Sequence, residues 1–230
     1  MKSKQSGFTL IEIAIVLVII GLLLGGVLKG QELINSARVK NLANDFKNVP
    51  VFIYGYQDKF KALPGDDAGA VTHVTGTLAT TPTSSGGTAC AGSVCTGNGI
   101  IDGKWNTTTQ TDETYLFWQH VRLAGFGPGS TTVGAADYIP TNAVGGKIGV
   151  TNALSADIPI TGIKGTYIVC SDGISGKFAK QLDTTLDNGD TATGSVMVTA
   201  AGTASGGTPV PTTGAGGIND DQTYLVCMGY

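Results

Sequence analysis

The sequence predicts an α+β protein in which a long N-terminal α-helix packs on a small antiparallel β-rich globular domain with long loops. Three observations predict this class. An apolar run near the N-terminus is long enough to span a membrane, an amphipathic pattern continues beyond it, and short strand-like segments alternate with Gly- and Thr-rich stretches in the remainder. We therefore expect a helix over residues 8–61 and a globular head over residues 62–230.

Composition favours an extracellular domain over a cytosolic enzyme. Of the 230 residues, 35 are glycine and 13% are charged, which is about half the usual charged share. Hydrophobic residues make up 41%, enough for a sizeable core. The net charge is −3 and the sequence contains no Lys/Arg run, so direct nucleic-acid binding is not predicted.

The first part of the predicted helix is an apolar run. Residues 8–28 carry only two polar side chains, those of Thr9 and Glu12. A helix of this length is about 31 Å long, close to the roughly 30 Å thickness of the hydrocarbon core of a bilayer. Two lysines and no acid precede the run, which places the N-terminus in the cytoplasm.

Three interpretations fit such a run. A secretory signal peptide has a shorter apolar region, of about 7–15 residues, and a small-residue cleavage site that this run does not contain. A plain single-span anchor explains the hydropathy but not Glu12. An acid inside a membrane span costs roughly 2.5–3.5 kcal/mol and indicates a function, and the span contains no basic partner for it.

The third interpretation rests on a resemblance. The string Gly7-Phe8-Thr9-Leu10-Ile11-Glu12 resembles the prepilin processing motif of type IV pilins and type II secretion pseudopilins. In that family a membrane peptidase cuts after the glycine and methylates the new N-terminal Phe. The resemblance implies a pilin fold, a leader peptide over residues 1–7 removed by prepilin peptidase, and a transmembrane segment over residues 8–28 that becomes the filament core.

The same resemblance gives Glu12 a role in assembly. Its carboxylate would meet the Phe8 amino group of a neighbouring subunit, which supplies the missing cation and sets one axial stagger. The implied partners are copies of the chain, the prepilin peptidase, the pilus or secretion assembly machinery, and the inner membrane before assembly. The implied location is the bacterial inner membrane for the precursor and then an extracellular filament, a pilus on the cell surface. Family members often carry a proline where this chain has Lys29, so the place where the helix would melt stays open.

The helical pattern continues past the apolar run as an amphipathic half. Its apolar residues recur every three or four positions on one face: Leu42, Phe46, Val49, Ile53, Tyr56 and Phe60. We expect this face to pack on the head. Pro50 should kink the helix, and the alternative is two separate helices joined near Pro50. The turn Leu63-Pro64-Gly65-Asp66-Asp67 predicts the stop, and it resembles the stop in one subgroup of pilin-like proteins.

The four cysteines predict two disulfides, because the head is expected to leave the cytosol. Three pairings of Cys90, Cys95, Cys170 and Cys227 are possible, and the simplest joins Cys90 to Cys95 and Cys170 to Cys227. The second bond would staple neighbouring strands, and the region that it encloses resembles the C-terminal disulfide-bounded region of type IV pilins. The cysteine spacing and the two histidines do not favour a zinc site.

Short elements are predicted through the head. We expect a helix over residues 112–123, capped by Asp112 and apolar on one side, and a short helix marked by Ile174, Phe178 and Leu182. Strands are expected at residues 163–170, 195–199 and 223–228, and loops at residues 75–99 and 200–217.

A calcium site is a hypothesis for one turn of the head. Calcium takes six to eight oxygen ligands, and closely spaced Asp and Asn side chains could supply several: Asp183, Asp187, Asn188 and Asp190. Some type II pseudopilins bind calcium in C-terminal loops. The EF-hand spacing is absent, and the alternative is an Asn-Gly turn with solvated acids. No other cofactor is predicted.

The sequence favours a structural filament subunit over two other classes. It contains no catalytic set, nucleotide loop or zinc cluster that we recognise, so we expect no enzyme; an anchored enzyme would need an acid/base set on its loops. A binding module, such as a minor pilin or adhesin whose Thr/Gly-rich loops contact a surface ligand, is the second alternative. A type II secretion pseudopilin is also open, although the size of the chain and its long loops favour a surface-exposed pilus subunit.

Overall fold

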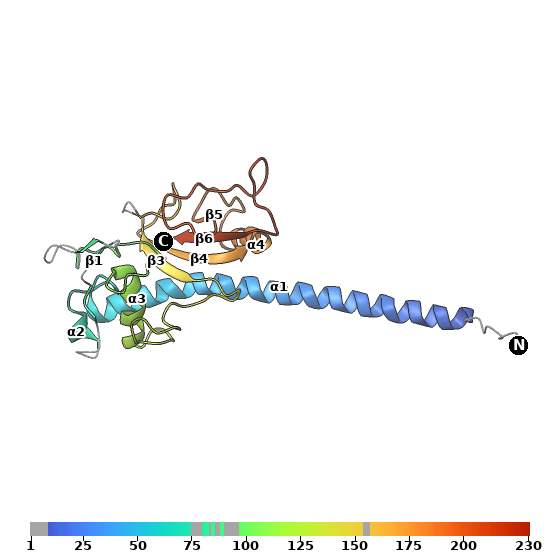
Figure 1. Cartoon of the computed structure of the whole chain (residues 1–230), viewed down its shortest axis with the longest axis horizontal. Helices are drawn as coiled ribbons and strands as arrows, with labels where there is room; N and C mark the ends of the chain where they lie inside the picture. The colour runs from blue at the N-terminus through green and yellow to red at the C-terminus, as the bar shows by residue number, and fades with distance from the viewer. Residues whose placement is uncertain (1–8, 75–79, 83, 86–87, 90–96, 154–156) are drawn as a thin grey trace, which may run out of the picture. The chain divides into compact units, whose positions relative to one another are not determined.

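The computed structural model describes residues 9–74, 80–82, 84–85, 88–89, 97–153 and 157–230. The chain divides into two compact units, Met1–Arg38 and Val39–Tyr230, and helix α1 (Leu10–Phe60) contributes to both. The other elements follow in the order shown in Figure 1: α2 (Ala70–His73), β1 (Ser84–Ser85), β2 (Thr88–Ala89), α3 (Glu113–Leu123), β3 (Ile148–Asn152), β4 (Tyr167–Ser175), α4 (Gly176–Leu186), β5 (Val196–Ala200) and β6 (Thr223–Gly229). The predicted α+β class is confirmed: a long, apolar N-terminal helix packs on a small antiparallel four-stranded sheet, which is a pilin-like layout.

In the first unit, α1 is an apolar rod. Its large apolar side chains are exposed on every side from Leu10 to Ile34. By length and composition this part of the chain can cross a membrane. A helix that is hydrophobic all round and unburied within its own chain needs lipid or another protein around it.

In the second unit, α1 becomes one wall of the core. The predicted apolar face is buried, with Leu42, Phe46 and Ile53 almost wholly inaccessible to solvent. The helix runs unbroken through Pro50, so the alternative of two separate helices is wrong. Pro50 removes one hydrogen bond from the ladder, but Val49 and Ile53 on either side of it are buried in the same core, and this packing holds the two halves in one helix.

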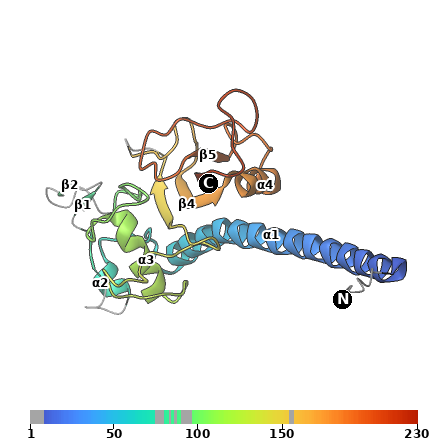
Figure 2. The same ribbon diagram turned by 45° about the vertical axis from the view of Figure 1, so that its right-hand side comes forward.

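The sheet has the strand order β3-β4-β6-β5, and every neighbouring pair is antiparallel. Figures 1 and 2 both place it along the second half of α1. Because side chains alternate between the two faces of a strand, Val169, Val198 and Val226 join the core that includes α1. The residues between them, such as Ile168 and Leu225, form a second, smaller core on the opposite face.

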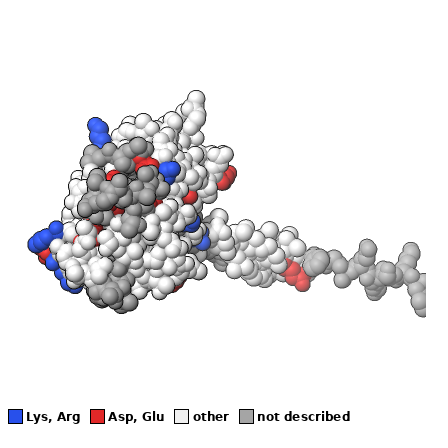
Figure 3. Space-filling model, turned by 60° about the vertical axis from the view of Figure 1, so that its left-hand side comes forward, with Lys and Arg blue, Asp and Glu red and all other residues white. Residues whose placement is uncertain are grey.

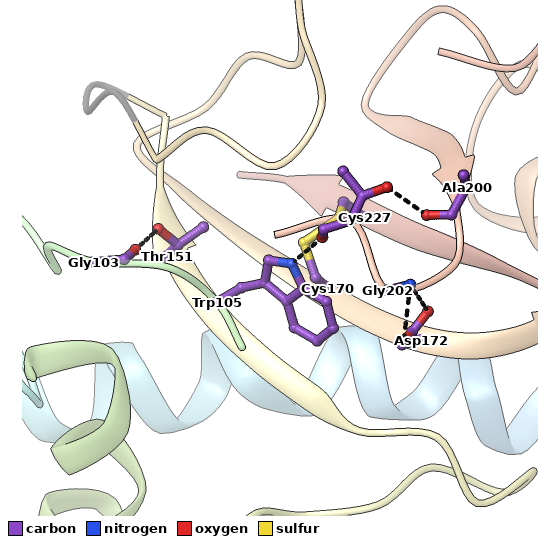
Figure 4. Close-up of a disulfide and its surroundings, with 9 residues drawn as sticks. Gly103, Trp105, Thr151, Cys170, Asp172, Ala200, Gly202 and Cys227 are labelled. Atoms are coloured by element: carbon purple, nitrogen blue, oxygen red, sulfur yellow. Dashed lines mark hydrogen bonds between the residues drawn. A yellow bond between two sulfur atoms is a disulfide. The ribbon is translucent and has the colours of Figure 1, made fainter. Parts of the chain in front are cut away.

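The predicted Cys170–Cys227 disulfide is present on this opposite face. The two cysteines lie directly across from each other in the β4–β6 ladder, with their Cα atoms 4.1 Å apart. Figure 4 shows the indole of Trp105 beside the disulfide; its Nε1 donates a hydrogen bond of 2.8 Å to the Thr203 carbonyl. Trp105 therefore packs against the sheet and closes its second face. The predicted Cys90–Cys95 bond lies outside the described residues.

Strand β4 differs from its predicted bounds at both ends, whereas β5 and β6 agree with theirs to within one residue. The strand expected at residues 163–170 begins at Tyr167 and continues to Ser175, so Ile174 lies in β4 and not in the following helix. After a register shift Ile174 pairs with Tyr224, which shows that pairing with β6 overrides the helical spacing of Ile174. Strand β3 was not predicted. It is paired on one side only, to β4, and contains Gly149, a residue that is depleted in strands.

Helix α3 is confirmed with Asp112 at its N-cap position, but it is not apolar on one side only. Every residue from Glu113 to Arg122 is buried. Several of its polar side chains are tolerated because they reach backbone groups; for example, Gln119 Nε2 donates to the Thr131 carbonyl at 3.1 Å. The Asp112 carboxylate makes no capping bond, and its Oδ2 accepts instead from the Thr107 hydroxyl at 2.6 Å.

The turn that ends α1 was predicted, and it also contacts α3. Gly65 has a φ of +93°, and a Cβ there would lie 2.5 Å from the Glu113 carbonyl oxygen, so only glycine fits. The Gly65 N–H donates to Nδ1 of the buried His120 at 3.0 Å, and His120 Nε2 lies 2.8 Å from the Thr80 carbonyl. Nδ1 must then be the acceptor and Nε2 the donor. This neutral imidazole agrees with its burial, which lowers the pKa of His120.

Removing the disulfide should destabilise the head without changing its fold. The bond joins residues that are 57 positions apart. Closing a loop of that length in the unfolded chain is worth about 4 kcal/mol in the chain-entropy description. We expect Cys170→Ser with Cys227→Ser to lower the free energy of unfolding by about that amount, as measured by denaturant unfolding of the full chain in non-ionic detergent, followed by tryptophan fluorescence. A loss below about 1 kcal/mol would contradict this account.

Candidate functional site

The N-terminus of α1 is capped by reciprocal hydrogen bonds between Thr9 and Glu12. The Glu12 Oε2 atom accepts hydrogen bonds from the Thr9 backbone N–H at 2.8 Å and from the Thr9 hydroxyl at 2.7 Å. In return, the Glu12 backbone N–H donates to the Thr9 hydroxyl oxygen at 3.3 Å. Since Thr9 precedes the first helical residue, this is a capping box, in which the fourth residue satisfies the backbone of the first.

The capping box gives Glu12 a role within its own chain that the sequence analysis missed. The signal was present, because Thr-x-x-Glu before an apolar run is the pattern of a capping box. Only one carboxylate oxygen is used: Oε1 makes no hydrogen bond to the described residues, and the side chain is exposed. A cation could therefore approach Glu12 without displacing Thr9.

The family described as the prokaryotic N-terminal methylation motif matches residues 2–28. The chain carries the prepilin signature of type IV pilins and pseudopilins. No curated protein matches the chain, and no solved structure does. Proteins with the prepilin signature form a structural rather than an enzymatic family.

The prepilin signature covers the residues that sequence analysis assigned to processing. Gly7 and Phe8 fall inside the match, although both lie outside the described residues. The signature implies processing by prepilin peptidase and assembly into a pilus or secretion filament. Together with the apolar first part of α1, it fits a precursor held in the inner membrane.

The four residues of the calcium hypothesis lie close together along the chain, and their oxygens bind backbone and side-chain groups. The Oδ1 atom of buried Asp183 accepts from the Gly189 N–H at 2.5 Å. The Oδ2 atom of Asp187 accepts from the N–H groups of Ser195 and Val196 at 2.6 and 3.0 Å. These contacts hold the segment between α4 and β5 in place.

The rest of this segment forms the turn that was the alternative to a metal site. Asn188 Oδ1 accepts from the Asp190 N–H at 2.8 Å, and Gly189 has a φ of +88°. Asp183 Oδ2 has no hydrogen-bond partner, and burial raises the pKa of Asp183 to about 6. Among the described residues, no three His, Cys, Asp or Glu side chains are grouped so that they could hold a metal ion. Calcium binding stays a prediction.

A buried acidic group links the turn after α1 to α3, and sequence analysis did not single it out. The Asp66 carboxylate accepts from three consecutive backbone N–H groups, those of residues 97, 98 and 99, at 2.5 to 3.2 Å. At the other end of that loop, the Asp102 N–H donates to Glu113 Oε2 at 2.7 Å. Glu113 is fully buried and its Oε1 has no partner. Burial and the nearby Asp66 and Asp102 raise the pKa of Glu113 to about 9.

A second buried acid, Asp67, joins α1 to α2. Its Oδ2 atom accepts from the Tyr56 hydroxyl at 2.6 Å and lies 2.7 Å from Nδ1 of His73. Its Oδ1 atom accepts from the Gly69 N–H at 2.8 Å. Like Asp66, Asp67 has its carboxylate oxygens bound by groups of its own chain, which links neighbouring segments.

Figure 3 shows the Lys, Arg, Asp and Glu residues of one face as small scattered groups on a mostly uncharged surface.

Blocking the processing site should leave the precursor intact. Replacing Gly7 by valine puts a branched side chain at the scissile bond, where the prepilin signature has glycine. We expect Gly7→Val to accumulate as a membrane-bound species that keeps residues 1–7, seen as a heavier intact mass than that of the wild-type protein. An intact mass equal to that of the wild-type protein would contradict the assignment.

The acidic group should make stability depend on pH. The pKa of Glu113 is raised in the folded protein, so between about pH 4.5 and pH 9 the folded state binds more protons than the unfolded state. Stability contributed by this group is therefore complete at low pH and lost as the pH rises. Glu113→Gln cannot ionise, so we expect its stability relative to wild type to improve by roughly 1–3 kcal/mol between about pH 5 and about pH 8.

Thermal unfolding at the two pH values measures this difference. Asp221→Asn is the control, because Asp221 is exposed. If Glu113→Gln kept the same pH dependence as the wild-type protein, the buried carboxyl would not be the cause.

Proposed function

We propose that this protein is a structural subunit of a type IV pilus-like filament, assembled from the inner membrane by packing of its N-terminal helix. The supporting observation is that the prepilin signature lies on a helix whose apolar side chains are exposed on all sides from Leu10 to Ile34. Lipid tails can cover such a surface in the precursor, and the helices of other subunits can cover it in a filament.

Small residues in the same helix favour close contact between helices. Gly21 and Gly25 are one helical turn apart, and so are Gly26 and Gly30. A Cβ at any of the four positions would meet no atom within 4 Å in the isolated chain. Glycines at this spacing let two helix backbones approach closely. Inside a membrane the hydrophobic effect does not drive helices together, so this close van der Waals packing stabilises their association instead.

In the proposed assembly, Glu12 sets the register. Cleavage after Gly7 creates an amino group on Phe8, and the Glu12 carboxylate of a neighbouring subunit neutralises it. The capping box positions this carboxylate, because Oε2 is held by Thr9 while Oε1 stays available. A buried charge is tolerated only when it is paired, so subunits that pack at a different stagger leave two unpaired charges in an apolar core.

The assembled filament is proposed to be an extracellular pilus in which the head faces outward. Abundance separates this role from the alternatives. A pilus subunit should be the main band of filaments sheared from the cell surface, whereas a minor pilin or adhesin should be scarce there and a secretion pseudopilin should be missing. Electron microscopy of sheared filaments, with mass spectrometry of their main band, tests the proposal directly.

Removing the Glu12 carboxylate should stop assembly but not membrane insertion. In Glu12→Leu the Phe8 amine of each neighbour loses its partner, and leaving one charge buried alone costs about 3–5 kcal/mol per subunit. We expect the yield of sheared filaments to fall by more than about tenfold, while the processed protein stays in the membrane fraction.

Glu32→Gln is the matched control, since Glu32 is an exposed acid on the same helix that pairs with Lys29 at 2.8 Å. The control should assemble normally. Unchanged filament yield from Glu12→Leu would argue against the register mechanism, even if the protein proved to be a pilus subunit.

A further inference from the structure

Asp45 is a half-buried acid for which the described residues provide no counter-ion. It lies on the part of α1 that belongs to the second unit, and no ion pair or hydrogen bond joins its carboxylate to another described residue. Positions one turn away on the helix hold Asn41 and Asn48, which carry no charge. Burial raises the pKa of Asp45 to about 6, and no neighbouring charge adds to or offsets this effect. Every other half-buried or buried acid described above is bound to backbone or hydroxyl groups.

Asp45 lines a cavity of about 210 Å³ between α1, α3 and the segment over residues 127–148. The walls are largely apolar and aromatic and include Phe52, Trp118, Val121 and Ile148. This composition is typical of small-molecule sites, which are mostly apolar with a few polar groups that fix orientation. The volume suits a short aliphatic chain with one polar end.

Among the described residues, the only other charged residue that lines the cavity is Arg122, and its Nε and Nη1 groups already donate to backbone carbonyls. Its Nε donates to the Pro128 carbonyl at 2.8 Å, and its Nη1 donates to the carbonyls of Ser130 and Tyr138 at 2.8 and 2.6 Å. The guanidinium also lies 5.7 Å from the ring centre of Trp118. Backbone carbonyls therefore hold Arg122 in the wall of the cavity, whereas the Asp45 carboxylate has no hydrogen-bond or ion-pair partner among the described residues.

We propose that this cavity binds a primary alkylammonium group, with the Asp45 carboxylate as its counter-ion and the apolar wall around its carbon chain. A lysine side chain has this chemistry, since it carries a compact ammonium on a flexible four-carbon stem. The aromatic ring of Phe52 adds a favourable surface for a cation. The group can come from a lysine of a second copy of this chain or from a free alkylamine. The proposal concerns the single subunit and does not rest on filament assembly.

The test is a titration of the full chain, in non-ionic detergent, with n-butylammonium chloride. Carbon-13 NMR of the aspartate carboxyl groups, with Asp45 assigned through its variant, reports binding at the site. We expect n-butylammonium to shift the Asp45 signal in a saturable manner, and n-butanol and sodium butyrate, which have the same carbon chain, to leave it unchanged. Equal shifts from n-butanol would show that the cavity binds the carbon chain and not the ammonium group. Larger shifts from butyrate would show that Arg122 binds an anion there. Either result overturns the proposal.

Variants and pH sharpen the same experiment. For the variants, binding of n-butylammonium is measured by isothermal titration calorimetry, since Asp45→Asn lacks the carboxyl signal. Asp45→Asn should weaken binding by roughly tenfold or more, whereas Asp58→Asn should not, because Asp58 is an exposed acid on the same helix. Butylammonium keeps its charge up to about pH 10, so loss of binding as the pH falls below about 6 must come from protonation of Asp45. Binding that does not change with pH in this range would contradict a role for the carboxylate.

The two sources of the ammonium group can be separated by cross-linking. A carbodiimide joins a carboxylate and an amine in direct contact as an amide, with loss of water. In a mixture of isotopically light and heavy chains, an amide between Asp45 of one copy and a lysine of the other identifies a second copy as the source. Saturable binding of butylammonium with no such amide identifies a free alkylamine.

Discussion

The burial of one face of α1 against the sheet is the contact on which the rest of the head depends. Leu42, Phe46 and Ile53 enter the same core as the inward-facing valines of β4, β5 and β6. A four-stranded sheet with two apolar faces cannot stand alone in water, and the helix covers one of them. The other face is closed by Trp105 and by the disulfide between β4 and β6. One helix therefore provides both the apolar rod of the first unit and a wall of the core in the second.

Several loops are held by acids that bind backbone N–H groups or join neighbouring elements. Asp66 and Asp187 each bind consecutive backbone N–H groups, and Asp67 joins α1 to α2. Within the described residues, five acids are buried: Asp66, Asp67, Asp112, Glu113 and Asp183. These internal uses explain in part why the face in Figure 3 shows few acids although the chain has 17. A carboxylate offers two oxygens to several donors, so one side chain can fix a glycine-rich loop that has few apolar side chains of its own.

Glu12 and Asp45, the two acids of α1 for which we propose a function, differ in how far the chain itself binds their carboxylates. Glu12 keeps one oxygen in a capping box and leaves the other available, so the proposed pairing with a neighbour would add to an existing local structure. Asp45 has no hydrogen-bond or ion-pair partner among the described residues and lines a largely apolar cavity. In both proposals, a carboxylate that is incompletely satisfied by the described residues receives a cation from outside the chain. This shared chemistry connects the proposed filament contact with the proposed ammonium site.

Features that depend on neighbours along the chain could be predicted from the amino-acid sequence. The apolar run, the amphipathic face from Leu42 to Phe60, the stop at Gly65 and the prepilin signature are local patterns, and each of them was readable because helix periodicity and turn chemistry act over a few residues. The capping box of Thr9 and Glu12 belongs to this class too, although it was overlooked.

The tertiary structure decided what depends on residues far apart in sequence. Pairing with β6 drew Ile174 into a strand, and pairing with β4 made a strand of Ile148–Asn152. Packing on all sides buried α3 from Glu113 to Arg122. The group of Asp66, Asp102 and Glu113 and the cavity beside Asp45 likewise exist only where separate segments meet. Burial and pairing are properties of the assembled core, and they outweigh local preference because each residue gains more from its packed neighbours than from its own conformational propensity.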